Sequence, residues 1–171
     1  DELILCNDSF YGPLYPLGEM FDAMNARDVD FWGITAHGKM KDKIKHGPYL
    51  YMPAHIQSYF TAIRRRMHTS ADFKEYWSQL PYYQDIQQLI NRHETVFTQY
   101  FHDKGFTWSV YINTEDLDGI YPNNRPLSYC FFDTYRLIAE RRSPVIKRHC
   151  FGRKYKCQLE FTNGMHLRRA I

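Results

Sequence analysis

The chain has 171 residues, of which 44% are hydrophobic, 24% charged and 17% aromatic, and its formal net charge is +3. This composition predicts one globular domain over residues 1–171 that buries its own core without disulfides. The small net charge is too mild to imply a nucleic-acid partner unless it is concentrated on one face, and we expect no such partner. No apolar run approaches the ~18–20 residues that a membrane-spanning helix needs.

The cysteines and the N-terminus indicate a cellular compartment. Cys6, Cys130, Cys150 and Cys157 form neither a CxxC motif nor the spacing of a zinc site or a disulfide framework. The N-terminus lacks the basic and then apolar layout of a signal peptide. We therefore expect reduced thiols and a cytoplasmic protein. Because the chain starts at Asp1 and enters a strand almost at once, we also expect it to be part of a longer polypeptide.

The first half of the chain predicts strands that alternate with helices. Residues 2–6 are a short apolar run, typical of a buried strand, and the run stops at the turn-forming segment Asn7-Asp8-Ser9. The elements expected after this turn are a helix between residues 12 and 27, a strand at 29–35, a polar loop at 36–47 and a strand at 55–60.

The second half contains the clearest helical pattern, from Tyr83 to Lys104, where apolar residues recur with helical spacing and Gly105 provides a C-terminal cap. Before it, Thr69 or Ser70 is expected to cap a short helix. After it, the pattern predicts a strand at 106–112 and an amphipathic helix at 127–141. Strands alternating with helices indicate α/β architecture, although this pattern does not fix the order of strands in the sheet.

Asn7, Asp8 and Ser9 are candidate metal ligands. They follow a strand, where α/β enzymes often place their chemistry. One carboxylate with neighbouring neutral oxygens could hold Mg²⁺ or Mn²⁺ against phosphate oxygens, because these ions prefer oxygen ligands. The alternative is a plain Asx turn with no ligand.

Two carboxylates are candidate general bases. Glu94 lies one position beyond the apolar stripe of the long helix, so it could face a cleft. The alternative for Glu94 is a solvated helix carboxylate. Asp30 stands at the start of a strand beside Trp32, where it could accept a hydrogen bond from a sugar hydroxyl or simply belong to a turn.

A basic segment is the candidate site for a diphosphate. Residues 147–156 hold five formal positive charges and no acid. Lys147, Arg148 and His149 could bind a diphosphate through charge-assisted hydrogen bonds. A solvated basic loop is the alternative, and a contact with anionic lipids is another. The preceding triplet Arg64-Arg65-Arg66 is expected to be surface charge.

Several segments together resemble a known family. The matching pieces are Leu5-Cys6-Asn7-Asp8-Ser9 with Gly12-Pro13, Asp30-Phe31-Trp32-Gly33-Ile34-Thr35, His55-Ile56-Gln57-Ser58-Tyr59-Phe60, residues 94–105 and Ser143-Pro144-Val145-Ile146-Lys147-Arg148. In order and spacing, roughly from residue 2 to residue 151, they resemble the rhamnan synthesis protein F family of glycosyltransferases, which is similar in layout to GT-A-type enzymes.

The resemblance implies a GT-A-like mixed sheet flanked by helices and lacking the N-terminal nucleotide-binding strands. Asn7-Asp8-Ser9 then looks like the counterpart of the metal-binding DXD motif, with one charged residue in place of two. Glu94 corresponds to the helix segment that supplies the base of an inverting transfer, although the expected acidic pair is reduced to Glu94-Thr95. A metal-independent mechanism, with Lys147 or Arg148 on the leaving diphosphate, stays open.

The function implied is transfer of a deoxyhexose, such as rhamnose, from a nucleotide-sugar to a growing polysaccharide or lipid-linked acceptor by single displacement. Trp32, with Trp108, is expected to stack on sugars. Along the strand at 55–60, His55, Gln57 and Tyr59 are expected to line the acceptor site. The cytoplasmic enzyme would contact the inner face of the plasma membrane peripherally. The alternative is a non-catalytic carbohydrate-binding or scaffold domain.

Overall fold

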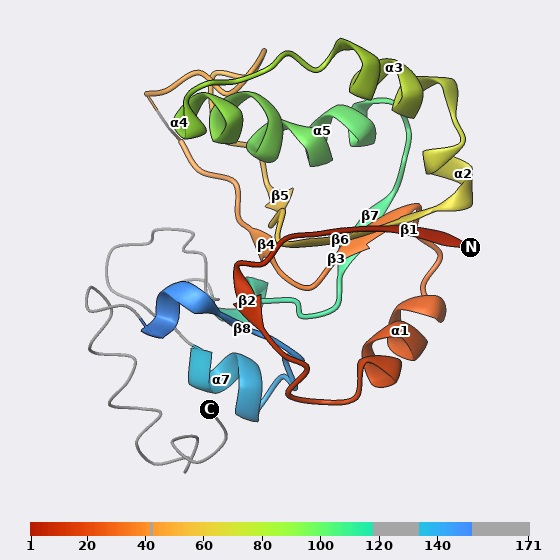
Figure 1. Ribbon diagram of the computed structural model, residues 1–171, viewed down its shortest axis with the longest axis vertical. Helices are drawn as coiled ribbons and strands as arrows, with labels where there is room; N and C mark the ends of the chain where they lie inside the picture. The colour runs from red at the N-terminus through yellow and green to blue at the C-terminus, as the bar shows by residue number, and fades with distance from the viewer. Residues whose placement is uncertain (42, 118–133, 152–171) are drawn as a thin grey trace.

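A computed structural model describes residues 1–41, 43–117 and 134–151 (Figure 1). Its main sheet has four strands in the order β1-β6-β3-β7. They are β1 (Glu2–Cys6), β3 (Phe31–Gly33), β6 (Phe60–Arg64) and β7 (Trp108–Val110). The mixed sheet with several helices confirms the prediction of an α/β fold.

The strand directions bring several chain segments to one edge of the sheet. β6 runs antiparallel to both β1 and β3, and β3 runs parallel to β7. The three strands β1, β3 and β7 therefore point the same way, and their carboxyl ends lie together with the start of β6. The segments that gather at this edge are residues 7–9, 34–37, 57–59 and 111–114.

Two strand predictions were wrong in part. β1 was expected to be buried, but it lies at the edge of the sheet, and Leu3 and Ile4 are each 37% exposed. The strand expected at 55–60 is two strands, because a turn at residues 57–59 separates β5 (His55–Ile56) from β6. β5 pairs with β4 (Ala36–His37), so the loop expected at 36–47 begins with a short strand.

Helices cover both faces of the sheet (Figure 1). α1 (Leu17–Asn25) lies on one face. The other face carries α2 (Arg65–His68), α3 (Ala71–Gln79) and α5 (Thr95–Asp103). Neighbouring residues of β3 and β6 point to opposite faces, so that Phe31 and Ile63 pack under α2, α3 and α5 while Trp32 and Ala62 pack against α1. Ser70 caps α3 by accepting a hydrogen bond from the Phe73 amide at 3.1 Å. It is one of the two residues that were expected to cap this helix.

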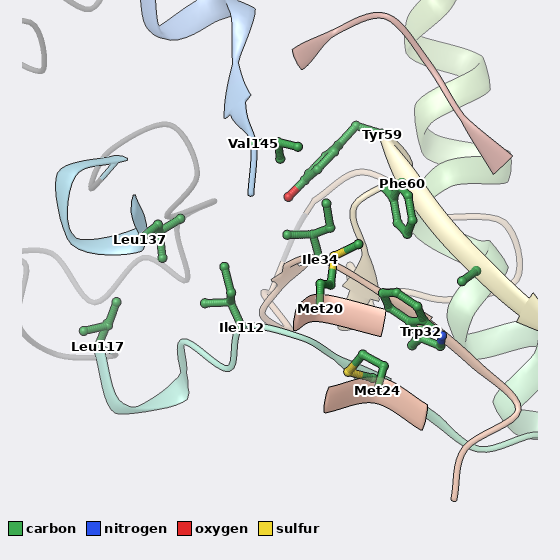
Figure 2. Close-up of a cluster of buried hydrophobic side chains, with 11 residues drawn as sticks. Met20, Met24, Trp32, Ile34, Tyr59, Phe60, Ile112, Leu117, Leu137 and Val145 are labelled. Carbon is green, nitrogen blue, oxygen red and sulfur yellow. The ribbon is translucent and has the colours of Figure 1, made fainter. Parts of the chain in front are cut away.

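The core on the α1 side also holds the C-terminal segments (Figure 2). Met20 and Met24 of α1 pack against Trp32 and Phe60, and further along the same cluster lie Tyr59, Ile112, Leu117, Leu137 and Val145. Leu117 ends a 3-10 turn, η2 (Glu115–Leu117), and Leu137 lies in α7 (Thr134–Ala139). This packing holds the segment around Val145 against the main sheet. α7 agrees with part of the helix expected at 127–141, and residues 127–133 lie outside the described residues.

The long helix expected at 83–104 is interrupted. It consists of α4 (Ile86–Leu89), a π-helical segment η1 (Ile90–Glu94) and α5. The Thr95 hydroxyl donates to the Ile90 carbonyl at 3.1 Å, across the wider turn. Single π-helical turns within helices are frequent at functional sites because they re-aim the side chains that they carry. Here the re-aimed residues include Glu94.

The described cysteines have different environments. Cys6 is exposed at the end of β1, and Cys150 is buried. Burial raises the pKa of the Cys150 thiol. Neither residue forms a disulfide within the described part of the chain, and Cys130 and Cys157 lie outside it.

Candidate functional site

A small two-stranded ribbon joins the two ends of the described chain. β2 (Phe10–Tyr11) pairs with β8 (Ile146–Lys147), and Phe10 lies opposite Lys147. The Arg148 amide donates to the Ser9 carbonyl at 2.9 Å. The predicted metal segment and the predicted diphosphate segment, which are 138 residues apart in sequence, therefore lie side by side.

The segment Asn7-Asp8-Ser9 forms an Asx turn. The Asn7 Oδ1 atom accepts hydrogen bonds from the Ser9 amide at 3.0 Å and from the Ser9 hydroxyl at 2.6 Å. The Asp8 carboxylate is 92% exposed and forms an ion pair with Arg148, 2.9 Å from Nη1 to Oδ2. The same Nη1 atom donates to the Asp8 carbonyl at 2.9 Å. The turn thus fixes Arg148, and its only carboxylate is already partnered.

Lys147 contributes a second cation to this turn. Its Nζ atom donates to the Ser9 hydroxyl at 2.5 Å and lies 4.4 Å from the centroid of the Tyr59 ring. Lys147 is only 8% exposed, so its charge acts in a less polar environment than that of a surface lysine. We name residues 7–9 with Lys147 and Arg148 the cationic turn, because it holds two cations and one carboxylate.

The cationic turn fits an anion better than a divalent metal ion. Within the described residues, no three His, Cys, Asp or Glu side chains lie close enough to hold a metal ion. Asp8 would have to release Arg148 to act as a ligand, and Lys147 and Arg148 would repel a dication. A diphosphate would instead gain charge-assisted hydrogen bonds from both cations. Dependence on Mg²⁺ or Mn²⁺ stays a prediction.

His149, the third residue expected to bind a diphosphate, is exposed in the 3-10 turn η3 (Arg148–Phe151). The basic window continues to residue 156, but residues 152–156 lie outside the described residues. Arg64 and Arg66 are not simple surface charges, since Arg64 donates to the carbonyls of Arg27 and Met24 at 2.7 and 2.6 Å. The triplet is therefore partly structural.

A buried polar network supports the cationic turn from below. The Thr35 hydroxyl lies 2.6 Å from the Gln57 Oε1 atom and 2.7 Å from the Tyr59 hydroxyl. Since Gln57 Oε1 can only accept, Thr35 donates to it, and the Tyr59 hydroxyl must donate to Thr35. Gln57 and Tyr59 are 8% and 3% exposed. The two residues expected to line an acceptor site are thus buried, and Tyr59 supports Lys147 from beneath.

Glu94 lies in a cleft whose lining includes one residue of the cationic turn, Asn7. This cleft, which we name the Glu94 cleft, has a volume of about 230 Å³, and its lining includes Asn7, Ser58, Trp77, His93 and Glu94. Asn7 and Glu94 therefore share one cavity, although Asp8 itself turns away toward Arg148. Asp8, Lys147 and Arg148 are not among the residues that line this cleft.

The Glu94 side chain is half-buried, and no hydrogen bond or ion pair within the described residues occupies its carboxylate. Its neighbour His93 accepts or donates a hydrogen bond with the Tyr76 hydroxyl at 2.7 Å, and burial lowers the pKa of this histidine. Trp77, at 37% exposed, stacks edge-on against His93. Trp77 is an aromatic wall of the cleft that the sequence did not single out, since it was interpreted as part of a short helix.

Trp32 was wrongly predicted to stack on a sugar. It is 0% exposed and packs against Phe60 (Figure 2). It also packs against Phe21 and donates from Nε1 to the Glu2 carboxylate at 3.0 Å. Phe31 and Trp32 are adjacent apolar residues of one strand and point to opposite faces, so the sequence left open which environment each would meet. The face chosen here is the core under α1, so no ring surface is left for a ligand.

Asp30 is held by structural contacts at the opposite end of the sheet, beside Arg64 rather than residues 7–9. Its carboxylate accepts hydrogen bonds from the Thr107 amide at 2.8 Å, from the Thr107 hydroxyl at 3.1 Å and from Arg66. Burial acts to raise the pKa of Asp30, but these hydrogen bonds outweigh it and hold the pKa below its usual value. Asp30 is therefore placed away from the cleft and is poorly suited to act as a base.

His55 is also buried rather than open to a ligand. It is 4% exposed, its Nδ1 atom lies 2.8 Å from the Pro53 carbonyl, and its ring stacks on His37 with centroids 5.3 Å apart. Burial lowers the pKa of His55 to about 4, with a further contribution from His37 and His46. His55 is thus a neutral core residue at neutral pH.

A second cleft lies beside the first. It has a volume of about 280 Å³ and is lined by the ends of β4 and β7 and by the turn that follows β7. Trp108, the other expected stacking residue, lines it and is half-buried. We name it the Trp108 cleft.

The fold and the site together define an α/β protein with a cationic turn at the carboxyl edge of its sheet, where Asn7 also lines a cleft that holds a carboxylate. The rhamnan synthesis protein F family matches residues 1–164 of this chain. The chain belongs to that family, whose description places it in the synthesis of a rhamnose polysaccharide.

A relative in Sinorhizobium fredii (strain NBRC 101917 / NGR234), described as "Uncharacterized protein y4gN", is 27% identical over 115 residues. The match covers 67% of this chain and 28% of the relative, so the chain spans well under half of that protein. No solved structure shows significant similarity to the chain. Among the described residues, none of the helices has the length and apolar character required to cross a bilayer.

Proposed function

We propose that this chain carries the reaction centre of a glycosyltransferase that moves a deoxyhexose, rhamnose by the family description, from a nucleotide-sugar to a growing cell-surface polysaccharide. The observation that carries the proposal is that Asn7, which belongs to the cationic turn, lines the cleft that holds Glu94. A leaving diphosphate needs cations, and an attacking hydroxyl needs a base. In the proposed site, the cations come from the cationic turn and the base from the cleft that Asn7 lines.

The proposed reaction is a single displacement. Glu94 takes the proton of an acceptor hydroxyl, and the oxygen attacks the anomeric carbon of the donor sugar. The new bond from carbon to the acceptor oxygen forms as the bond from carbon to the diphosphate oxygen breaks, with inversion at carbon. The electron pair of the broken bond leaves with the diphosphate.

Lys147 and Arg148 would stabilise that leaving group. Electrostatic stabilisation of developing charge by preorganised groups is usually the largest contribution to catalysis. Lys147 is preorganised by Ser9 and Tyr59, and Arg148 by Asp8. Since little water reaches Lys147, its charge would be screened less than that of an exposed lysine. A divalent ion, if the reaction uses one, would need an arrangement of Asp8 other than its pairing with Arg148.

A non-catalytic carbohydrate-binding or scaffold domain is the second candidate function. One observation favours it: the only carboxylate of the turn, Asp8, is engaged by Arg148. Both functions place a sugar beside Trp77 and Glu94. They differ in whether the bond between the donor sugar and its diphosphate is broken.

The proposed partners follow from this chemistry. They are a nucleotide-sugar donor and a polysaccharide or lipid-linked acceptor. Arg148 and His149 are exposed, and together with the basic residues up to 156 they would attract the anionic inner face of a plasma membrane. Peripheral contact there would bring the site to a lipid-linked acceptor.

The test of the proposed function is transfer by the purified protein from a panel of nucleotide-sugars, compared with the variant Glu94→Gln. Removal of a general base is expected to lower kcat by about 10²–10⁴-fold. Donor affinity, measured separately by calorimetry, is expected to stay within about twofold, because Gln keeps the size of Glu. Glu75→Gln is the matched control, since Glu75 is an exposed carboxylate of α3. An active Glu94→Gln protein would exclude Glu94 as the base.

A further inference from the structure

The Trp108 cleft has no part in the proposed reaction, and its lining differs in chemistry from that of the cationic turn. One wall is the half-buried ring of Trp108. The polar groups that line it come from six positions, namely Arg27, His37, Ser109, Asn113, Thr114 and Glu115. An aromatic side chain together with hydroxyl, amide and carboxylate groups in one cleft suits a ligand with an apolar ring face and hydroxyls at its rim.

The charges of this cleft are balanced. Arg27 donates from Nη1 to the Val110 carbonyl at 2.7 Å and to the Ser109 hydroxyl at 3.0 Å, so its guanidinium is directed to the end of β7. Glu115, which also lines the cleft, supplies one negative charge, and burial lowers the pKa of His37, which keeps that ring neutral near pH 7. The cleft therefore lacks the excess of cations that a diphosphate requires, and favours a neutral ligand.

The position of the cleft links it to the reaction centre. Ala36 lines the Trp108 cleft, Ile56 lines the Glu94 cleft, and these two residues face each other in the β4–β5 pair. The charge of Glu94 also acts on His37, which lines the Trp108 cleft. The two clefts are thus neighbours, separated by one pair of strands.

We propose that the Trp108 cleft is a binding subsite for a neutral sugar ring of the acceptor glycan, next to the unit whose hydroxyl reacts at Glu94. The subsite rests on the proposed function for its place in the reaction. Its binding chemistry depends only on the groups that line it. Such a subsite would hold the growing chain between additions and select glycan over water as the acceptor.

The test is calorimetric titration of the purified protein with a short rhamnose oligosaccharide in the absence of donor. Trp108→Leu removes the stacking ring, and the double variant Thr114→Val with Glu115→Gln removes a hydroxyl and a charge at nearly constant volume. We expect the dissociation constant to rise about tenfold or more for Trp108→Leu and severalfold for the double variant. Binding of a nucleoside diphosphate should be unchanged in both.

Because Trp108 also packs against the core beside Phe31 and Phe106, Trp108→Leu could lose stability, and the double variant keeps the test decisive. Glu75→Gln is the matched control for charge. The subsite would be overturned if neither set of substitutions changed the dissociation constant for the oligosaccharide, or if the unaltered protein did not bind it. Binding that depends on these residues in a protein without transfer activity would uphold the subsite while the proposed glycosyl transfer fails.

Discussion

At the scale of single residues, the chemistry of the site depends on which charged side chains are paired with each other. Asp8 is exposed, yet its carboxylate holds Arg148 rather than standing ready for a metal ion. Lys147 is buried, yet it lies beside a hydroxyl and an aromatic ring that stabilise its charge. The consequence is that the turn presents cations, and its anionic residue serves to position one of them.

This arrangement makes a prediction for Asp8→Asn. Removing the carboxylate removes a negative charge and releases Arg148, so affinity for a nucleoside diphosphate is expected to stay equal or rise severalfold. The measurement is calorimetric titration in the presence of EDTA. Asp72→Asn, which removes a carboxylate paired with Lys104 on the far helical layer, is the control and should change nothing. Binding that requires Mg²⁺ or Mn²⁺ and disappears in Asp8→Asn would instead establish a metal site.

At the scale of elements, the close approach of β3 to β5 depends on a glycine. A Cβ atom at Gly33 would lie 2.2 Å from Ile56 Cγ2 and 3.0 Å from the Phe60 carbonyl. Both neighbours belong to the strands that place residues 57–59 beneath the cationic turn. Since the second neighbour is backbone, it cannot yield without moving β6.

Gly33→Ala is therefore expected to lower the free energy of unfolding by about 1–3 kcal/mol, as overpacked cores do. Urea denaturation measures it. Gly18→Ala in α1 is the matched control, because no atom beyond its chain neighbours and the backbone of its own helix lies within 4 Å of the added methyl group. In a helix this change should stabilise by up to about 1 kcal/mol. A Gly33→Ala protein as stable as the unaltered one would contradict the close packing of β3 on β5.

At the scale of the whole molecule, buried neutral histidines couple folding to pH. His55 has a pKa of about 4 in the folded protein, chiefly because of burial, against 6.5 for an exposed histidine. The unfolded chain therefore binds more protons than the folded one between these pH values. Stability from His55 is complete above pH 6.5 and is lost as the pH falls toward 4. Burial lowers the pKa of His37 and His93 as well, which acts in the same direction.

We expect acidification from pH 7 to pH 4.5 to lower the free energy of unfolding, with up to about 3 kcal/mol from His55 alone. Urea midpoints over this range measure the loss. His55→Gln, which keeps a donor toward the Pro53 carbonyl, should be less stable at pH 7 and should flatten the pH dependence. An equal slope in the two proteins would show that His55 does not remain neutral in the fold.

Local patterns were sufficient for much of the fold. Short apolar and β-rich runs predicted β1, β3 and β7, and apolar residues at helical spacing predicted several helices, because these patterns depend on neighbouring residues. Ser70 and Gly105 marked helix ends for the same reason, and Gly105 has the expected positive φ of 87°. The family resemblance, carried by five separate segments, was confirmed by the match over residues 1–164.

The sequence by itself therefore determined the α/β class, the family and the residue types at the site. Only the tertiary structure decided that Trp32, His55 and Asp30 serve the core, that Trp77 and Trp108 line clefts, and that Lys147 meets Ser9. The physical reason is the separation in sequence between the residues that interact. Secondary structure follows from neighbours a few positions apart, whereas burial and ion pairing depend on contacts such as Ser9 with Lys147, which only the completed sheet brings together.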